Sequence, residues 1–302
     1  MSKINFVTYC MDNDMFQFSE NYLGPFIQSL IDIYKDDFHL TLTHSNVKNE
    51  QLDKVKNKVK NLTLVESAKG HLKQNPLIPA HKIGQSWTPT LDKLGEGERI
   101  VLIDCDTVII KPIDRFFDFD FDLAYTFYKD HFAPYGTPSM MKTSKGRNRI
   151  NTGVMLCKNS DPLKKFFQEY LRRVEAFLDA GSPLGGEFLA PDQDALMWML
   201  SNGGLDWERP YLDLINLEWS AIYENDQVKT YKLKVKTFSC KELNEPESIG
   251  EPTEETHIIH YKGGWRDVIP KPNWNKPKGI RTKENSLPFY NIWLNKLNKW
   301  NS

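Results

Sequence analysis

Two carboxylates separated by one residue follow a continuous apolar run in the first half of the chain. Asp104 and Asp106 come directly after residues 100–103, and a turn-like Gly-Glu-Gly-Glu segment precedes the run. Such a run is typical of a strand buried on both faces of a sheet. Because an unpaired carboxylate is costly to bury, we expect the strand to end at Asp104, at the carboxyl edge where open α/β sheets bind ligands. Two carboxylates there suit a divalent cation, which a phosphate-bearing substrate would share.

An isolated Asp-x-Asp pair often only caps a turn, so its meaning depends on the other polar motifs. Three motifs follow it, namely Asn-Thr-Gly at residues 151–153, Asp-Gln-Asp at 192–194 and His-Tyr-Lys-Gly-Gly-Trp-Arg at 260–266. Each alone has an ordinary structural explanation, as a turn former, a helix cap or a core histidine. Their occurrence together, in this order, favours a single functional site.

The first half of the chain alternates between strand-like and helix-like segments. We expect strands at residues 3–10, 38–43, 62–65 and 99–104. We expect helices at residues 22–34, 50–59 and 79–94, the last of them broken at Pro89. This alternation predicts an α/β fold with a mostly parallel sheet and helices on both faces.

The second half has a mixed pattern. Strands are expected at residues 121–128, 151–158, 219–223, 231–238 and 256–261, and helices at 161–178 and 191–202. Residues 129–149 form a long loop of the kind that covers substrates. Residues 242–255 hold many glutamates and are expected to be an exposed loop.

The composition is that of an ordinary globular protein, with 302 residues, 40% hydrophobic content and a formal net charge of −1. No global charge bias points to nucleic acid. Four widely spaced cysteines without a Cys-x-x-Cys pair predict buried, reduced thiols and a cytoplasmic location. We find no signal-peptide pattern and no apolar run of the roughly 20 residues that a membrane span needs.

The C-terminal tail, residues 269–302, is basic and rich in tryptophan. A helical stripe of apolar side chains is expected at Phe289, Trp293, Leu297 and Trp300, flanked by lysines. The stripe either touches a membrane peripherally or packs back on the domain. We favour the second alternative because the helix is short.

The four motifs, in their order, resemble those of the retaining glycosyltransferases of family 8. The resemblance covers about residues 4–266 and is strongest over residues 99–194 and around His260. It implies a GT-A fold, with one domain over residues 1–268. A Rossmann-like nucleotide-binding half would reach to about residue 110, and a mixed acceptor half would span residues 111–268.

The resemblance also implies a metal and diphosphate site. Asp104 and Asp106 match the family's Asp-x-Asp aspartates, and His260 matches its third protein ligand, so all three would hold Mn²⁺ or Mg²⁺. Gly263 would let the backbone approach the diphosphate. Arg266 lies where the family usually has lysine and would keep the positive charge there.

Further positions match residues around the donor in this family. Asn151 and Asp192 would contact the donor sugar, and the amide of Gln193 would lie near the anomeric carbon. An amide is a poor nucleophile, so the leaving phosphate itself would take the proton of the acceptor. Lys82 would meet the phosphates or the sugar, and Thr8, at the end of the first strand, would line the base pocket.

The function implied is transfer of a hexose from UDP-glucose or UDP-galactose to an acceptor, with retention. The acceptor is open among glycans, lipid-linked glycans, proteins and nucleic acids. The principal alternative is a haloacid-dehalogenase-like phosphatase, with Asp104 as nucleophile and Asp106 as acid/base. That class places the motif on its first strand and adds an acidic magnesium motif later, whereas three strands precede the motif here.

Overall fold

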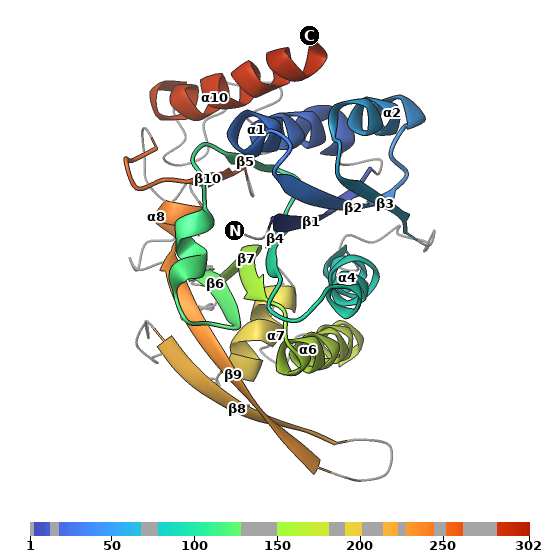
Figure 1. Ribbon diagram of the computed structural model, residues 1–302, viewed down its shortest axis with the longest axis vertical. Helices are drawn as coiled ribbons and strands as arrows, with labels where there is room; N and C mark the ends of the chain where they lie inside the picture. Colours follow the sequence, from blue (N-terminus) through green and yellow to red (C-terminus); the bar gives the residue numbers. More distant parts are fainter. Residues whose placement is uncertain are drawn as a thin grey trace.

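A computed structural model describes residues 3–12, 18–67, 78–127, 150–180, 191–200, 214–222, 228–244, 252–261 and 283–302. Its centre is an eight-stranded sheet with the strand order β3-β2-β1-β4-β7-β6-β9-β8. The four strands on one side of this order come from residues 4–103, and the four on the other side come from residues 123–239 (Figure 1).

The first half of the chain forms the parallel part of the sheet. It contains β1 (Ile4–Met11), β2 (Phe38–Ser45), β3 (Leu62–Glu66) and β4 (Arg99–Ile103). Strand β1 pairs in parallel with both β2 and β4, and β2 pairs in parallel with β3. The expected alternation is therefore confirmed, and β4 ends at Ile103, directly before Asp104.

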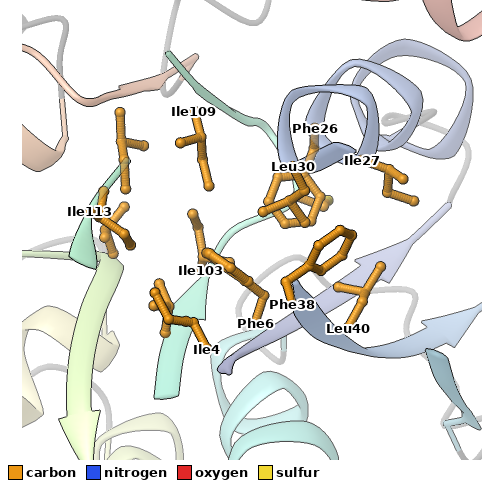
Figure 2. Packing of buried hydrophobic residues seen from close by; sticks show 14 of the residues in the cluster. Ile4, Phe6, Phe26, Ile27, Leu30, Phe38, Leu40, Ile103, Ile109 and Ile113 are labelled. Carbon is orange, nitrogen blue, oxygen red and sulfur yellow. The ribbon is translucent and has the colours of Figure 1, made fainter. Parts of the chain in front are cut away.

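Helices cover both faces of this parallel part. On one face lie the π-helical turn η1 (Ser19–Leu23), α1 (Gly24–Tyr34) and α2 (Asn49–Lys58). Figure 2 shows Phe26 and Leu30 of α1 facing Phe6 and Phe38 of the sheet. On the other face, Ile83, Trp87 and Leu91 pack with side chains of α6 (Asp161–Ala180) and α7 (Pro191–Leu200).

The helical segment before β4 differs from the prediction. Helix α3 (Ile78–His81), the π-helical turn η3 (Lys82–Trp87) and α4 (Thr88–Lys93) follow one another without an extended residue between them. Pro89 lies in the first turn of α4, so the expected break at Pro89 is wrong. Because the π-helical turn changes the hydrogen-bond spacing just before Pro89, the missing N–H of proline is accommodated without a break.

The later strands, within residues 123–239, complete the sheet with mixed pairing. Strand β7 (Ile150–Lys158) pairs antiparallel with both β4 and β6 (Leu123–Phe127), and β6 pairs in parallel with β9 (Val228–Ser239). Strand β8 (Leu214–Ile222) forms a hairpin with β9, and both are longer than predicted. The short 3-10 helix η4 (Asp114–Asp118) leads into β6.

A second, two-stranded sheet joins distant parts of the chain. Strand β5 (Thr107–Ile109) pairs antiparallel with β10 (Ile258–His260), which follows the short helix α8 (Cys240–Leu243). The register places His260 opposite Thr107. This pairing brings the end of the last strand to the Asp-x-Asp segment.

The C-terminal helix α10 (Lys283–Asn301) packs along α1 (Figure 1). Phe289, Trp293 and Trp300 are buried, and Leu297 is partly buried, so the aromatic stripe faces the protein. Gly24 permits the close approach, because a Cβ there would lie 2.4 Å from Cδ1 of Trp300. Among the residues described, no helix combines the length and apolar character that crossing a bilayer requires.

Candidate active site

Asp104, Asp106 and His260 meet at the carboxyl end of β4. One ligand atom from each lies within 4.8 Å of the others. Nε2 of His260 is 3.1 Å from Oδ1 of Asp106 and 3.6 Å from Oδ2 of Asp104. Asp106 and His260 are buried, whereas Asp104 is partly open to solvent. The three residues predicted from the motifs therefore form one cluster.

The backbone around this cluster is held by several strands. The N–H of Asp104 donates to the carbonyl of Gly153 on β7, and the N–H of Tyr261 donates to the carbonyl of Asp106. The hydroxyl of Thr107 donates to the carbonyl of Asp104. The Asp-x-Asp segment is thus a turn fixed between β4, β7 and β10.

Lys82 is the cation on the other side of Asp104. Its Nζ lies 3.0 Å from Oδ1 of Asp104 and 3.5 Å from Oδ2 of Asp192, and 4.6 Å from the centre of the Trp87 ring. Burial by itself lowers the pKa of Lys82, but the two carboxylates outweigh burial and raise that pKa above its ordinary value. Lys82 is therefore charged at neutral pH and links the Asp-x-Asp segment to α7.

Asp192 lies in the first turn of α7 and is itself fixed from two directions. The hydroxyl of Thr152 donates to its Oδ2 at 2.6 Å, and the hydroxyl of Tyr170 on α6 donates to its backbone carbonyl at 2.9 Å. Burial, followed by the charges of Asp192 and Asp104, raises the pKa of Tyr170 well above its ordinary value, so Tyr170 keeps its hydrogen. The predicted Asp-Gln-Asp motif thus joins the Asp-x-Asp segment through Lys82.

A buried amide network lies behind His260. Oδ1 of Asn244 is 2.7 Å from Nδ1 of His260, and Nδ2 of Asn244 donates to Oδ1 of Asn151 and to the hydroxyl of Thr126. Gly153 lies against the imidazole, since a Cβ there would be 2.2 Å from Cε1 of His260. The Asn-Thr-Gly motif therefore supports His260 as well as Asp192.

Asn244 corrects one prediction about the second half of the chain. The segment 242–255 was expected to be an exposed loop, but Leu243 and Asn244 are fully buried. The glutamate-rich composition of this segment predicts exposure for all of it. Asn244 is buried because α8 packs against β6 and β10. Thr126 and Tyr170 are further residues of the site that no motif indicated.

The remaining predicted positions have different outcomes. Gln193 is half-buried in the first turn of α7, next to Asp192. Thr8 is fully buried, and within the described residues its hydroxyl has no hydrogen-bond partner. Gly263, Arg266 and the predicted covering loop at 129–149 lie outside the described residues.

The cluster fits a divalent cation chemically. Carboxylate oxygens and an imidazole nitrogen are a donor set that suits Mn²⁺. Lys82 is paired with Asp104 and Asp192, and Nε2 of His260 faces both aspartates of the Asp-x-Asp segment. Two carboxylates and an imidazole that converge at these distances would be stabilised by a bound cation.

Comparison with known proteins gives fold-level likenesses. The chain matches no protein-family model. It is similar to the uncharacterized protein R707 of Acanthamoeba polyphaga mimivirus, with 24% identity over 216 residues. That alignment covers 67% of this chain and 62% of R707, so it spans less than two thirds of the relative.

Several solved glycosyltransferases share the architecture. The galactosyltransferase LgtC, in complex with donor and acceptor sugar analogs, has a TM-score of 0.51 at 11% identity, covering 97% of this chain and 95% of LgtC. The bifunctional glycosyltransferase WbbM has a TM-score of 0.53 at 12% identity, covering 98% of this chain and 50% of WbbM. GlyE of Streptococcus pneumoniae TIGR4 has a TM-score of 0.50 at 12% identity, covering 99% of this chain and 63% of GlyE. The central sheet and its flanking helices are therefore those of the GT-A fold found in these glycosyltransferases.

Proposed function

We propose that the protein is a metal-dependent glycosyltransferase that moves a hexose from a nucleotide-sugar to an acceptor. The observation that carries the proposal is the convergence of Asp104, Asp106 and His260 at the carboxyl edge of the sheet. This is where α/β folds bind nucleotides and where a diphosphate could share a cation with the protein.

Each residue of the site has a proposed role. Asp104, Asp106 and His260 would hold Mn²⁺ or Mg²⁺, which when bound neutralises charge on the leaving diphosphate. Lys82 and Asp192 would orient the donor, since a buried ammonium and a fixed carboxylate can contact phosphate and sugar hydroxyl groups. Gln193, beside Asp192, is proposed to face the anomeric carbon.

Asn151 has a less direct place in this scheme. Its amide oxygen accepts hydrogen bonds from the N–H of Gly153 and from Asn244. Asn151 therefore supports the ligand histidine in addition to the donor contact proposed for it. Thr8 is proposed to line the pocket for the nucleotide base. Gly263 is proposed to let the backbone approach the diphosphate, and Arg266 to supply positive charge there.

The finer assignments come from the family resemblance. We propose UDP-glucose or UDP-galactose as the donor and retention as the stereochemical course, with residues 1–268 as the catalytic unit. The LgtC comparison structure holds donor and acceptor sugar analogs, which supports a donor of this class. All four cysteines are buried thiols, which supports a reducing, cytoplasmic setting.

The phosphatase alternative is not favoured by the geometry. A haloacid-dehalogenase-like enzyme would use Asp104 as a nucleophile on its first strand. Here Asp104 follows β4 of a GT-A sheet, is ion-paired with Lys82 and lies beside an imidazole from β10.

The decisive experiment is removal of one ligand. We expect Asp106→Ala to abolish Mn²⁺-dependent binding of UDP and of the nucleotide-sugar, because a buried ligand is lost while the backbone hydrogen bonds of the turn remain. Calorimetric titration of Mn²⁺ and UDP measures this, and circular dichroism checks the fold. Asp118→Ala, an exposed carboxylate at the end of η4, is the matched control. Unchanged Mn²⁺ and UDP affinity in Asp106→Ala would refute the site.

A further inference from the structure

Asn244 lies against Nδ1 of His260, on the side of the ring away from the two aspartates. It is fully buried after α8, and its Oδ1 is 2.7 Å from Nδ1. The distance alone does not say which atom carries the hydrogen, because a neutral imidazole can hold it on either nitrogen. The neighbours of Asn244 decide the question.

The orientation of two amides follows from one backbone donor. The N–H of Gly153 can only donate, so the atom of Asn151 that lies 2.8 Å from it is the oxygen. That same oxygen lies 2.8 Å from Asn244, so the facing atom of Asn244 is the amide nitrogen. The other hydrogen of this nitrogen goes to the hydroxyl of Thr126, which itself donates to the carbonyl of Asn151.

The remaining amide atom of Asn244, its oxygen, therefore faces His260. An amide oxygen only accepts, so Nδ1 of His260 must be the donor. We propose that Asn244 is a positioning residue that keeps the hydrogen of His260 on Nδ1 and directs the Nε2 lone pair toward Asp104 and Asp106. The metal-binding consequence rests on the proposed function, whereas the position of the hydrogen does not.

The surroundings of Nε2 explain why such a residue is needed. Oδ1 of Asp106 lies 3.1 Å from Nε2 and would accept a hydrogen from it. Without Asn244, the neutral imidazole would be stabilised with its hydrogen on Nε2, where it would block a cation. A hydrogen-bond acceptor on Nδ1 offsets this preference, as carboxylates and carbonyls do behind many metal-bound histidines.

Gly153 limits the rotation of the ring. Its missing side chain leaves just enough room for Cε1 and Nδ1 of His260, and the close contact holds the imidazole plane against β7. Asn244 thus fixes the position of the ring hydrogen, and Gly153 fixes the orientation of the ring. Both are separate from the ligands that would contact a cation.

The test reads the position of the hydrogen directly. In protein carrying ¹⁵N-labelled histidine, we expect Nδ1 of His260 to show a bonded hydrogen both without a divalent cation and with saturating Mg²⁺. In Asn244→Leu, the hydrogen should move to Nε2, and the Mn²⁺ dissociation constant from electron paramagnetic resonance should rise about 10- to 100-fold. Thr126→Val, which alters the same cluster without contacting His260, should leave the hydrogen on Nδ1.

The outcomes separate this inference from the proposed function. A wild-type Nδ1 without a bonded hydrogen would overturn the inference, and this measurement needs no variant to fold. An Asn244→Leu protein that keeps the Nδ1 hydrogen and binds Mn²⁺ within about threefold of wild type would also overturn the inference. Loss of such a contact is expected to weaken metal binding about 10- to 100-fold. An Nδ1 hydrogen in a protein that binds no Mn²⁺ would support the role of Asn244 and defeat the proposed enzyme.

Discussion

Lys82 connects two parts of the candidate site through its ion pairs. It is buried between Asp104 and Asp192, two carboxylates that come from different elements of the fold. One buried and one partly buried carboxylate without a cation would be costly. The lysine therefore stabilises the folded protein and, under the proposed function, also binds the donor.

We expect Lys82→Met to lower the free energy of unfolding by about 3 kcal/mol, because two partly buried carboxylates lose their counter-charge. Urea denaturation in the presence of a chelator, followed by tryptophan fluorescence, measures the change. Lys93→Met, at an exposed position of α4, should stay within about 0.5 kcal/mol of wild type. Equal stabilities for the two variants would show that the ion pairs contribute nothing.

A second prediction for a single residue concerns Gly153. A Cβ there would approach His260 Cε1 to 2.2 Å and Oδ1 of Asn151 to 2.9 Å. Gly153→Ala should therefore displace the imidazole, weaken Mn²⁺ binding at least tenfold and destabilise the fold by about 1–3 kcal/mol through overpacking. Mn²⁺ titration and urea denaturation measure the two effects.

The control for this variant is another glycine. At Gly95 an added Cβ would meet only the side chain of Glu98, at 3.8 Å, so Gly95→Ala should change neither quantity measurably. A Gly153→Ala protein that binds Mn²⁺ as tightly as wild type would mean that His260 is not held against β7.

At the scale of elements, α10 is fastened to α1 by charge as well as by apolar contact. Lys296 and Lys299 donate to Oδ2 of Asp32, and Nε2 of Gln28 donates to its Oδ1. Burial by itself raises the pKa of Asp32, but these hydrogen bonds outweigh it and hold that pKa below the ordinary value. The ionised form of Asp32 is therefore the one that the folded protein favours.

The sign of the pH dependence follows from this shift. Because the pKa of Asp32 is lower in the folded than in the unfolded chain, its contribution is complete above the ordinary value of 3.8 and is lost as the pH falls below it. Asp32→Asn should be less stable than wild type at pH 7 by about 0.2–1 kcal/mol, as for partly exposed ion pairs. The difference should vanish at pH values below the lowered pKa.

Urea denaturation of wild type and Asp32→Asn between pH 7 and pH 2.5 measures this difference. Lys296→Met removes one of the two lysine partners and should reproduce part of the loss at pH 7. A gap between wild type and Asp32→Asn that persists unchanged at the lowest pH would show that the contact is not electrostatic.

At the scale of the whole molecule, the site lies where the two halves of the sheet join. Strand β4 pairs in parallel with β1 and antiparallel with β7, and the polar residues gather at its end. His260 meets Asp106 across 154 positions of sequence, and Lys82 meets Asp192 across 110. Ligand binding should therefore stabilise the complete fold and not one segment of it.

A thermal-shift screen tests this expectation. UDP with Mn²⁺ at about 100 times the dissociation constant should add about 2.7 kcal/mol and raise the Tm by about 5 °C. Mn²⁺ alone or UDP alone should do less, and a chelator should remove the effect. No shift with any nucleoside diphosphate, together with hydrolysis of a simple phosphate ester, would favour a phosphatase.

The sequence by itself determined the order of the elements and the end of the central strand. The apolar run before Asp104 predicts a buried strand, and unpaired carboxylates are costly to bury, so the place of the two aspartates at the sheet edge follows from local pattern and desolvation. The alternation of the first half likewise predicts a parallel sheet. These are local properties, and the structure confirms them.

Only the tertiary structure decided which distant residues meet. The register of β5 with β10 brings His260 to Asp106, and the packing of α8 buries Asn244 within a segment whose composition predicts exposure. The choice of α1 as the element that the α10 stripe packs against is a further example. Hydrophobic periodicity reports on one element at a time, whereas register and side-chain packing depend on residues more than a hundred positions apart.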